Sequence, residues 1–285
     1  MTTFHVTGKE TMERHLAPRP RGRALARVAA ALVISSWALP GIAAPEWDIV
    51  GLKLGMTEAE ARAALQAYDP KGKIVANHSG FSYSDKVQQF KTPTFLNSIE
   101  VRVTRLSIEM PLKVWFSGPI GDVRVIAISR QEYNLPNPPT GAQFRQSLIA
   151  KYGQAKDFGN QKLPYWEEAG KPSCINTTIG LNFNEFSSVI IPPGKRDFSE
   201  AADALERRQR GEGAMKGVGM PADLKSCGAF LYYTGTNNNP ANHFVAGMFD
   251  VGGIIATHRS RNEWVDQLEA EAIRKREAKG QGPRL

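Results

Sequence analysis

Apolar residues at helical spacing follow a T-x-x-E motif at Thr57–Glu60. In such a capping box the threonine hydroxyl accepts a hydrogen bond from the glutamate amide, and the glutamate side chain accepts one from the threonine amide. Asp69-Pro70 ends the segment, because proline disfavours the helical conformation of the residue before it. A short amphipathic helix is therefore predicted between Thr57 and Asp69. The apolar positions at i, i+3, i+4 and i+7 are Ala61, Ala64, Leu65 and Tyr68.

Alternating apolar and polar residues predict strands further along. The alternation at Ile99–Thr104 is typical of a half-buried strand. Two apolar runs, Val114–Phe116 and Val123–Ile128, flank a turn at Gly118-Pro119 and indicate a hairpin. The polar, glycine-containing segment 71–93 before them is assigned no strand. Together these runs predict an antiparallel meander against which the first helix packs.

A second capping box, T-x-x-Q at Thr140–Gln143, opens another amphipathic segment. Its apolar stripe ends at Tyr152, and Gly153 stands where a C-terminal glycine cap belongs. The two capping threonines are 83 residues apart, and the same offset aligns Leu65 with Leu148. The correspondence favours a tandem repeat of helix plus sheet, and coincidence between two short motifs is the alternative.

The chain after the second helix mixes strand and helix patterns. Strand-like runs occur at Tyr165-Trp166, Cys174–Phe183 and Ser188–Ile191, and Ser199–Arg210 has the pattern of a charged helix. The glycine-rich segment Gly211–Lys225 lacks apolar periodicity, so it is expected to be an exposed excursion. Such a segment is either a solvated loop or a binding flap.

The last elements are a hairpin and a helix. Gly228–Gly235 and His243–Val251 flank an asparagine-rich turn and predict the hairpin. Past Ile254-Ile255, a C-terminal helix containing Trp264 is expected to end at Gly280.

These elements predict an α+β protein in which helices pack on antiparallel sheets. The expected parts are a signal peptide at 1–44, a first helix-on-sheet module at 45–135, a second at 136–260 with an excursion at 199–225, and a C-terminal helix and tail at 261–285.

The N-terminal segment has the order of a secretory signal. Five arginines precede an apolar run, Val28–Ala44, that closes on small residues. The run contains Pro40 and is short for a membrane span of about twenty residues, so an uncleaved anchor is the less favoured alternative. Met12 would be a more typical start than Met1. After cleavage no transmembrane span is expected.

Charge gives no case for a nucleic-acid partner. The chain has 36 Lys and Arg against 28 Asp and Glu, and removing residues 1–44 leaves 30 basic and 26 acidic residues. The excess is small, and apart from Arg207-Arg208-Gln209-Arg210 the sequence has no dense cluster of Lys and Arg of the kind found in nucleic-acid-binding proteins.

The two cysteines, Cys174 and Cys227, both follow the export signal. An even pair in an oxidising compartment is most simply a disulfide, and the pair lacks the C-x-x-C spacing of a redox site.

Motifs for chemistry are sparse. Phosphate-loop and G-x-S-x-G patterns are absent from the sequence, and the G-x-G-x-x-A match at Gly217–Ala222 lacks the preceding strand and following helix of a dinucleotide site. His78, His243 and His258 show no metal-ligand spacing. No catalytic, cofactor or metal residues are therefore assigned. His243, beside the asparagine-rich turn, is the histidine most worth locating in the structure. Asp250 is either a catalytic carboxylate or the cap of the Gly252-Gly253 turn.

The stretch Gly51–Thr57, GLKLGMT, with the acidic, alanine-rich helix after it, resembles the entry of the BamE-like (SmpA/OmlA) family. The resemblance covers about twenty residues. It implies helices on one face of a small antiparallel sheet, in exported bacterial proteins that include a lipoprotein of the outer-membrane assembly machine. This chain has no cysteine directly after its signal peptide that could carry a lipid.

Two functions fit these observations. One is a non-catalytic periplasmic protein that binds another envelope protein or an envelope component, through a sheet face or through Gly211–Lys225. The other is an exported hydrolase whose site comes from residues far apart in the sequence. A binding protein requires an exposed apolar surface, whereas a hydrolase requires a pocket with converging polar groups.

The signal peptide predicts where the exported protein begins. Protein recovered from the envelope fraction is expected to begin directly after Ala43 or Ala44, because the small residues there form the cleavage site. N-terminal sequencing checks this, and a chain that still carries Val28–Ala43 would contradict it.

Overall fold

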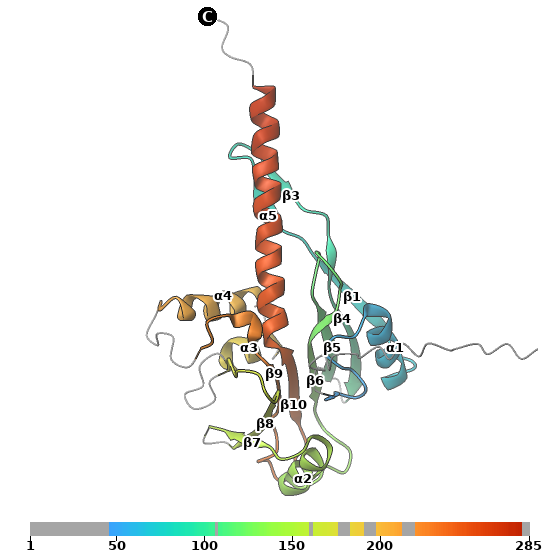
Figure 1. The fold of residues 1–285 in the computed structure, drawn as a ribbon. Helices are drawn as coiled ribbons and strands as arrows, with labels where there is room; N and C mark the ends of the chain where they lie inside the picture. Colours follow the sequence, from blue (N-terminus) through green and yellow to red (C-terminus); the bar gives the residue numbers. More distant parts are fainter. Residues whose placement is uncertain are drawn as a thin grey trace, which may run out of the picture. The chain divides into compact units, whose positions relative to one another are not determined.

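The computed structural model describes residues 46–105, 108–159, 162–175, 183–190, 198–212 and 220–280. These residues form an eight-stranded antiparallel sheet, a separate two-stranded hairpin and five α-helices (Figure 1). The predicted α+β class, with helices packed on an antiparallel sheet, is confirmed.

The first half of the fold is a helix followed by four strands of the large sheet. The helix α1 spans Glu58–Tyr68, and both hydrogen bonds of its capping box join Thr57 and Glu60. A small hairpin, β2–β3, branches off between β1 and β4. The strand bounds are β1 Ile74–Ser79, β2 Ser82–Ser84, β3 Gln89–Lys91, β4 Phe95–Arg105, β5 Ile108–Phe116 and β6 Val125–Glu132.

The second half repeats this order with a different insertion. The helix α2 spans Gly141–Tyr152, with Thr140 and Gln143 forming its capping box and Gly153 its C-terminal cap. Four strands follow, and a helical segment lies between the second and third of them. The bounds are β7 Lys156–Phe158, β8 Leu163–Glu167, α3 Phe183–Ile190, α4 Phe198–Gln209, the 3-10 turn η1 Leu224–Ser226, β9 Ala229–Tyr233 and β10 Phe244–Asp250.

The two halves meet along β6 and β10. These strands pair antiparallel, from Phe244 opposite Glu132 to Phe249 opposite Ala127. The strand order of the sheet is therefore β1-β4-β5-β6-β10-β9-β8-β7. Each half runs from an outer strand to the centre in the same helix-then-four-strand order. The strands of both expected modules thus belong to a single sheet.

Different helices cover the two faces of this sheet. α1 and α2 lie over one face, where Leu65 and Leu148 pack with sheet residues such as Leu231. α3, α4 and the start of α5 cover the other, where Leu205 packs with sheet residues such as Phe230. Phe230 and Leu231 are neighbours on β9, so alternation along the strand sends them to opposite cores. This double burial explains why β9 is apolar throughout, as AFLYY.

A charged network links the two halves on the face covered by α1 and α2. Arg130 of β6 forms an ion pair of 3.0 Å with Glu132, whose side chain is 2% exposed. The Tyr68 hydroxyl donates to the same carboxylate at 2.7 Å. The Arg130 guanidinium also lies 5.3 Å from the rings of both Tyr68 and Phe244. The network ties α1 and β6 to β10, with Glu132 buried and the Arg130 side chain 23% exposed.

The C-terminal helix α5, Val251–Lys279, follows β10 without a loop. It begins at Val251 rather than beyond Ile255, because the buried Ile254-Ile255 pair belongs to its first turns and not to a strand. Arg261, 6% exposed, donates to the carbonyl oxygens of Gly118 at 2.6 Å and Phe116 at 3.3 Å. These bonds fix the helix to the end of β5. Among the described residues, no helix is long and apolar enough to cross a membrane.

Two sequence-based assignments are wrong. Segment 71–93, assigned no strand, contains β1, β2 and β3, whose half-exposed residues give little apolar alternation. Residues 188–190 of the predicted Ser188–Ile191 strand are the end of the helix α3, whose buried Phe186 and Val189 are three residues apart, and residue 191 lies outside the described residues. A short apolar run does not distinguish a strand from a buried helix. Within the predicted Cys174–Phe183 strand, residues 176–182 lie outside the described residues.

The expected excursion Gly211–Lys225 is not exposed throughout. Residues 213–219 lie outside the described part of the chain. Leu224 is 0% exposed and packs in the core beneath α4 and α5. The end of this segment is therefore anchored.

Cys174 and Cys227 form a disulfide with a Cα–Cα distance of 5.7 Å. Both residues are buried, and the bond joins the chain after β8 to the segment that leads into β9. The first turn of α5 packs on this segment. A Cβ at Gly252 would lie 2.8 Å from the Cys227 carbonyl oxygen and 2.5 Å from that of Lys225, so only glycine fits there.

Removing the disulfide is expected to destabilise the protein. For the 53-residue separation, the chain-entropy model gives a contribution of about 4 kcal/mol to the free energy of unfolding. Urea unfolding of a Cys174→Ala/Cys227→Ala variant, compared with the oxidised protein, measures the loss. An unchanged midpoint would contradict the expectation.

Candidate functional site

The two residues selected for inspection do not form one site. His243 precedes β10 and Asp250 ends it, so the strand separates them by roughly 20 Å at about 3.3 Å per residue. The exposed His243 ring stacks on Tyr133 at 6.0 Å, and its nitrogens lie 3.2 Å from Asn238 Nδ2 and 2.9 Å from Asn242 Oδ1. These contacts order the turn between β9 and β10.

Asp250 caps the helix α5. Its carboxylate accepts a hydrogen bond from the Gly253 amide at 2.8 Å. A Cβ at Gly253 would lie 2.2 Å from Asp250 Oδ2, so the cap requires glycine there. Burial raises the pKa of the Asp250 carboxyl, although the bond from Gly253 opposes the shift. The interpretation of Asp250 as a cap is correct.

The other sequence-based candidates are dispersed. His78 lies on β1 and His258 on α5. Residues 217–219 of the G-x-G-x-x-A match at Gly217–Ala222 lie outside the described residues.

A groove of about 660 Å³ lies between the β2–β3 hairpin and the second half of α5. This hairpin–helix groove is where the branch from the first half reaches the C-terminal helix (Figure 1). Tyr83 and Phe90 stack at 5.4 Å on the hairpin side, and Leu268 and Ala272 line the helix side. Val87, at the turn of the hairpin, is 73% exposed and also lines the groove.

The rim of the groove is basic on the helix side. Lys275, Arg276 and Lys279 line it in the last turns of α5. Glu271 neutralises Lys275 at 2.6 Å. On the hairpin side the Asp85 carboxylate accepts from the amides of its own turn, and these bonds lower its pKa. Arg276 lies 4.0 Å from Glu277, and the lining as a whole has three cations against the two carboxylates of Asp85 and Glu271, a small excess of positive charge.

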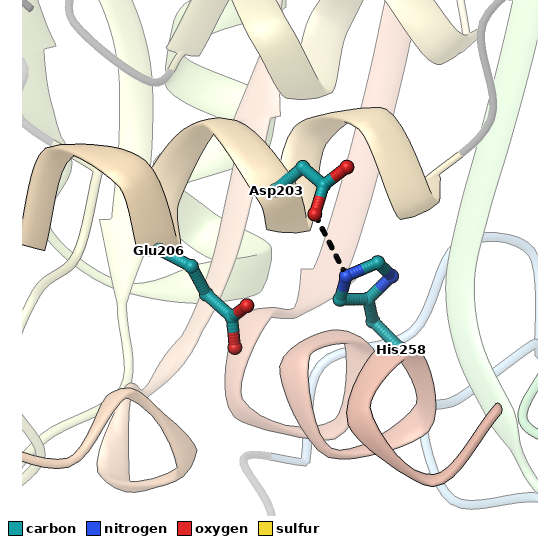
Figure 2. Close-up of side chains that lie close together, drawn as sticks. All are labelled: Asp203, Glu206 and His258. Atoms are coloured by element: carbon teal, nitrogen blue, oxygen red, sulfur yellow. Dashed lines mark hydrogen bonds and ion pairs between the residues drawn. The ribbon is translucent and has the colours of Figure 1, made fainter. Parts of the chain in front are cut away.

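A second polar cluster lies where α4 meets α5. Asp203 and Glu206 of α4 face His258 of α5, and one ligand atom from each lies within 4.8 Å of the others. Figure 2 shows the His258 ring between the two helices with Nε2 directed at Asp203, at 3.0 Å from Oδ1. The side chain of His258 is 6% exposed and that of Asp203 is 55% exposed. The cluster is thus buried at the histidine and open to solvent at the aspartate.

Two residues of α5 complete the surroundings. Arg259 Nε lies 2.6 Å from Glu206 Oε1, and its Nη1 lies 3.5 Å from Asp223 Oδ1. Asn262 Nδ2 lies 3.1 Å from His258 Nε2. Imidazole and carboxylate at this spacing are able to transfer a proton or hold a metal ion.

Sequence spacing gave no signal for this cluster. Asp203 and His258 are 55 residues apart and meet only because α4 and α5 pack together. The sequence contains one weak indication of the cluster. Two acidic residues, three positions apart, lie on one predicted helix, and a histidine lies near the start of another.

No protein-family model, curated protein or solved structure matches the chain. Its function therefore has to be inferred from the groove and the cluster themselves.

The role of Asp250 can be tested against a catalytic one. Asp250→Ala removes the cap and is expected to lower the free energy of unfolding by about 1 kcal/mol. Asp250→Asn keeps an oxygen acceptor and removes a buried charge. Since the folded pKa of Asp250 is raised, ionisation lowers stability as pH rises from the unfolded value of 3.8 through the folded pKa.

At pH 7 the asparagine variant is therefore expected to be at least as stable as the native protein. Its advantage should disappear in acid, where Asp250 is protonated in both states. Thermal unfolding between pH 3.5 and 7 measures both differences. Equal losses in the alanine and asparagine variants at pH 7 would argue against the cap.

Proposed function

We propose that this chain is an exported, non-catalytic periplasmic protein of the bacterial cell envelope that binds another envelope protein. The hairpin–helix groove is the binding surface, and it is the observation that carries the proposal. The central strands of the sheet are covered on both faces, by α1 and α2 on one and by α3, α4 and α5 on the other. The groove instead leaves apolar side chains within reach of a partner.

The chemistry of the groove defines the partner. Tyr83, Phe90 and Leu268 supply apolar area, and Arg276 and Lys279 supply positive charge at the rim. An amphipathic segment with one apolar face and flanking carboxylates complements both. Apolar burial provides most of the affinity in such contacts, and charge at the rim favours rapid and selective association.

Localisation and family are further parts of the proposal. The basic and apolar N-terminal segment supports export, and the disulfide between Cys174 and Cys227 suits an oxidising compartment. The GLKLGMT stretch before α1 supports a BamE-like first module. The same helix-then-four-strand order in the second half supports a second, related module.

The alternative is an exported hydrolase, and the cluster at α4 and α5 is the observation that favours it. The pairing of His258 with Asp203 resembles a general base with its orienting carboxylate. Turnover of an envelope polymer by the purified protein, lost in a folded His258→Ala variant, would support this function over binding.

If the groove is the binding surface, a negative charge placed in it should weaken binding of the partner. A photo-crosslinking residue at position 87 should join the protein to one envelope partner, which is then purified and titrated. Val87→Asp places a carboxylate in the apolar groove and is expected to weaken that complex by at least about tenfold, since each 1.4 kcal/mol is a factor of ten.

Ile120→Asp is the matched control, because Ile120 is 47% exposed on the loop between β5 and β6, away from the groove. It should leave the affinity unchanged. Equal crosslinking from positions 87 and 120, or equal affinity of the two aspartate variants, would refute the groove as the binding surface.

A further inference from the structure

The contact between α4 and α5 has the composition of a metal site. We propose that Asp203, Glu206 and His258 bind one divalent transition-metal ion, and that Zn²⁺ suits their donor set. Zinc accepts imidazole nitrogen and carboxylate oxygen, and three protein ligands leave its fourth position to water. The imidazole ligand disfavours Ca²⁺ and Mg²⁺, which take oxygen ligands. This site is independent of the hairpin–helix groove.

The distances suit a small cation. With metal–ligand bonds of about 2.0–2.2 Å, tetrahedral zinc places neighbouring ligand atoms about 3.3 Å apart. His258 Nε2 and Asp203 Oδ1 are already 3.0 Å apart, and the ligand atoms of all three residues lie within 4.8 Å. Binding would require the Glu206 carboxylate to move closer to the other two ligand atoms while its Oε1 is held by Arg259 at 2.6 Å.

The ligands stand on a packed scaffold. Asp203 and Glu206 are three residues apart and so lie on one face of α4. Their neighbours Ala202 and Leu205 are 0% exposed in the core, which fixes the orientation of the helix. His258 lies on α5, one turn beyond the buried Ile254. Ligands on rigid helices are positioned more precisely than ligands on loops.

The buried His258 ring has polar neighbours at one of its two nitrogens. Nε2 lies 3.0 Å from a carboxylate, which accepts hydrogen bonds, and 3.1 Å from the Asn262 amide nitrogen, which donates them. With the amide in this orientation one ring nitrogen cannot satisfy both, whereas a turned amide offers its oxygen to a protonated Nε2. The other nitrogen, Nδ1, is buried and has no hydrogen-bond partner among the described residues.

A cation would use Nε2 as a ligand. The ring nitrogen then gives its lone pair to the ion, and Asp203 binds the ion instead of the ring. Asn262 is able to turn its carbonyl oxygen toward the site, since the two ends of an amide are assigned from their hydrogen bonds.

The local charge also favours a cation. Asp203 faces His258, and Glu206 and Asp223 pair with Arg259. Arg210 also interacts electrostatically with Asp203 and Glu206, so these three carboxylates are opposed by two guanidinium groups. Arg259 contacts Oε1 of Glu206, and a carboxylate has a second oxygen to offer. A hydrogen-bonded neighbour of this kind orients a ligand. Asp203, with its side chain 55% exposed, provides the entrance from solvent.

Equilibrium dialysis against ZnCl₂ tests the site. The protein as purified from the envelope, without a histidine tag and treated with a chelator, is expected to retain one zinc ion per chain by elemental analysis. His258→Gln and Asp203→Asn should each weaken retention by at least tenfold. Glu206→Gln should do the same, with Arg259 left in place.

His243→Gln is the matched control, because His243 is an exposed histidine of the β9–β10 turn. It should retain zinc like the native protein. Circular dichroism without zinc checks that each variant folds. Co²⁺ in place of zinc should give visible absorption bands that the His258→Gln variant lacks. Absence of bound zinc, or retention that His258→Gln leaves unchanged in a folded protein, would overturn the proposal.

Discussion

The pairing of β6 with β10 is the contact on which the rest of the structure depends. Six residue pairs join the two half-sheets there. Because the ladder continues through the centre, each face of the sheet becomes one surface that helices from both halves can cover. The Arg130–Glu132 pair adds a specific contact at the seam, with rings from α1 and β10 against the guanidinium. Pairing by backbone alone would leave the register less well defined.

The position of α5 follows from the same seam. β10 ends at Asp250, whose side chain starts the helix at once, so α5 leaves from the middle of the sheet. Its first turns pack on η1 and on the disulfide-bearing segment, and Arg261 ties it to β5. A helix of 29 residues is about 43 Å long, and its buried residues end at Arg261, so the core contacts only its first part. The remainder meets the β2–β3 hairpin, and this meeting forms the groove.

Sequence reasoning succeeded where the signal was local. Both capping boxes, the β9–β10 hairpin and the helix α4 are encoded by neighbouring residues, and the structure has each of them. It failed where tertiary packing decides. The three-residue strands β2 and β3 have no periodicity to detect, and α3 is too short for its pattern to exclude a strand.

The sequence suggested two helix-on-sheet modules, but it did not suggest that their strands form one sheet. The spacing of Thr57 and Thr140 suggested two modules, and each module was expected to carry a sheet. Nothing in either capping box specifies that β6 and β10 pair, because that contact is made by strands distant from both. The joining of the two half-sheets into one sheet is therefore decided by tertiary packing.

Both proposed sites lie on α5, and this explains why motif searches miss them. His258 meets residues from α4, and Leu268 faces residues of a hairpin about 180 positions earlier in the chain. Ten residues separate them on the helix, about 15 Å along its axis. The two halves of α5 therefore contribute different side chains. The first half, which packs on the core, contributes the His258 imidazole and the charge of Arg259. The second half contributes the apolar side chain of Leu268 and the cations of its last turns. The segments inserted between β1 and β4 and between β8 and β9 supply the opposing walls, so elements outside the helix-then-four-strand order of each half contribute to both sites.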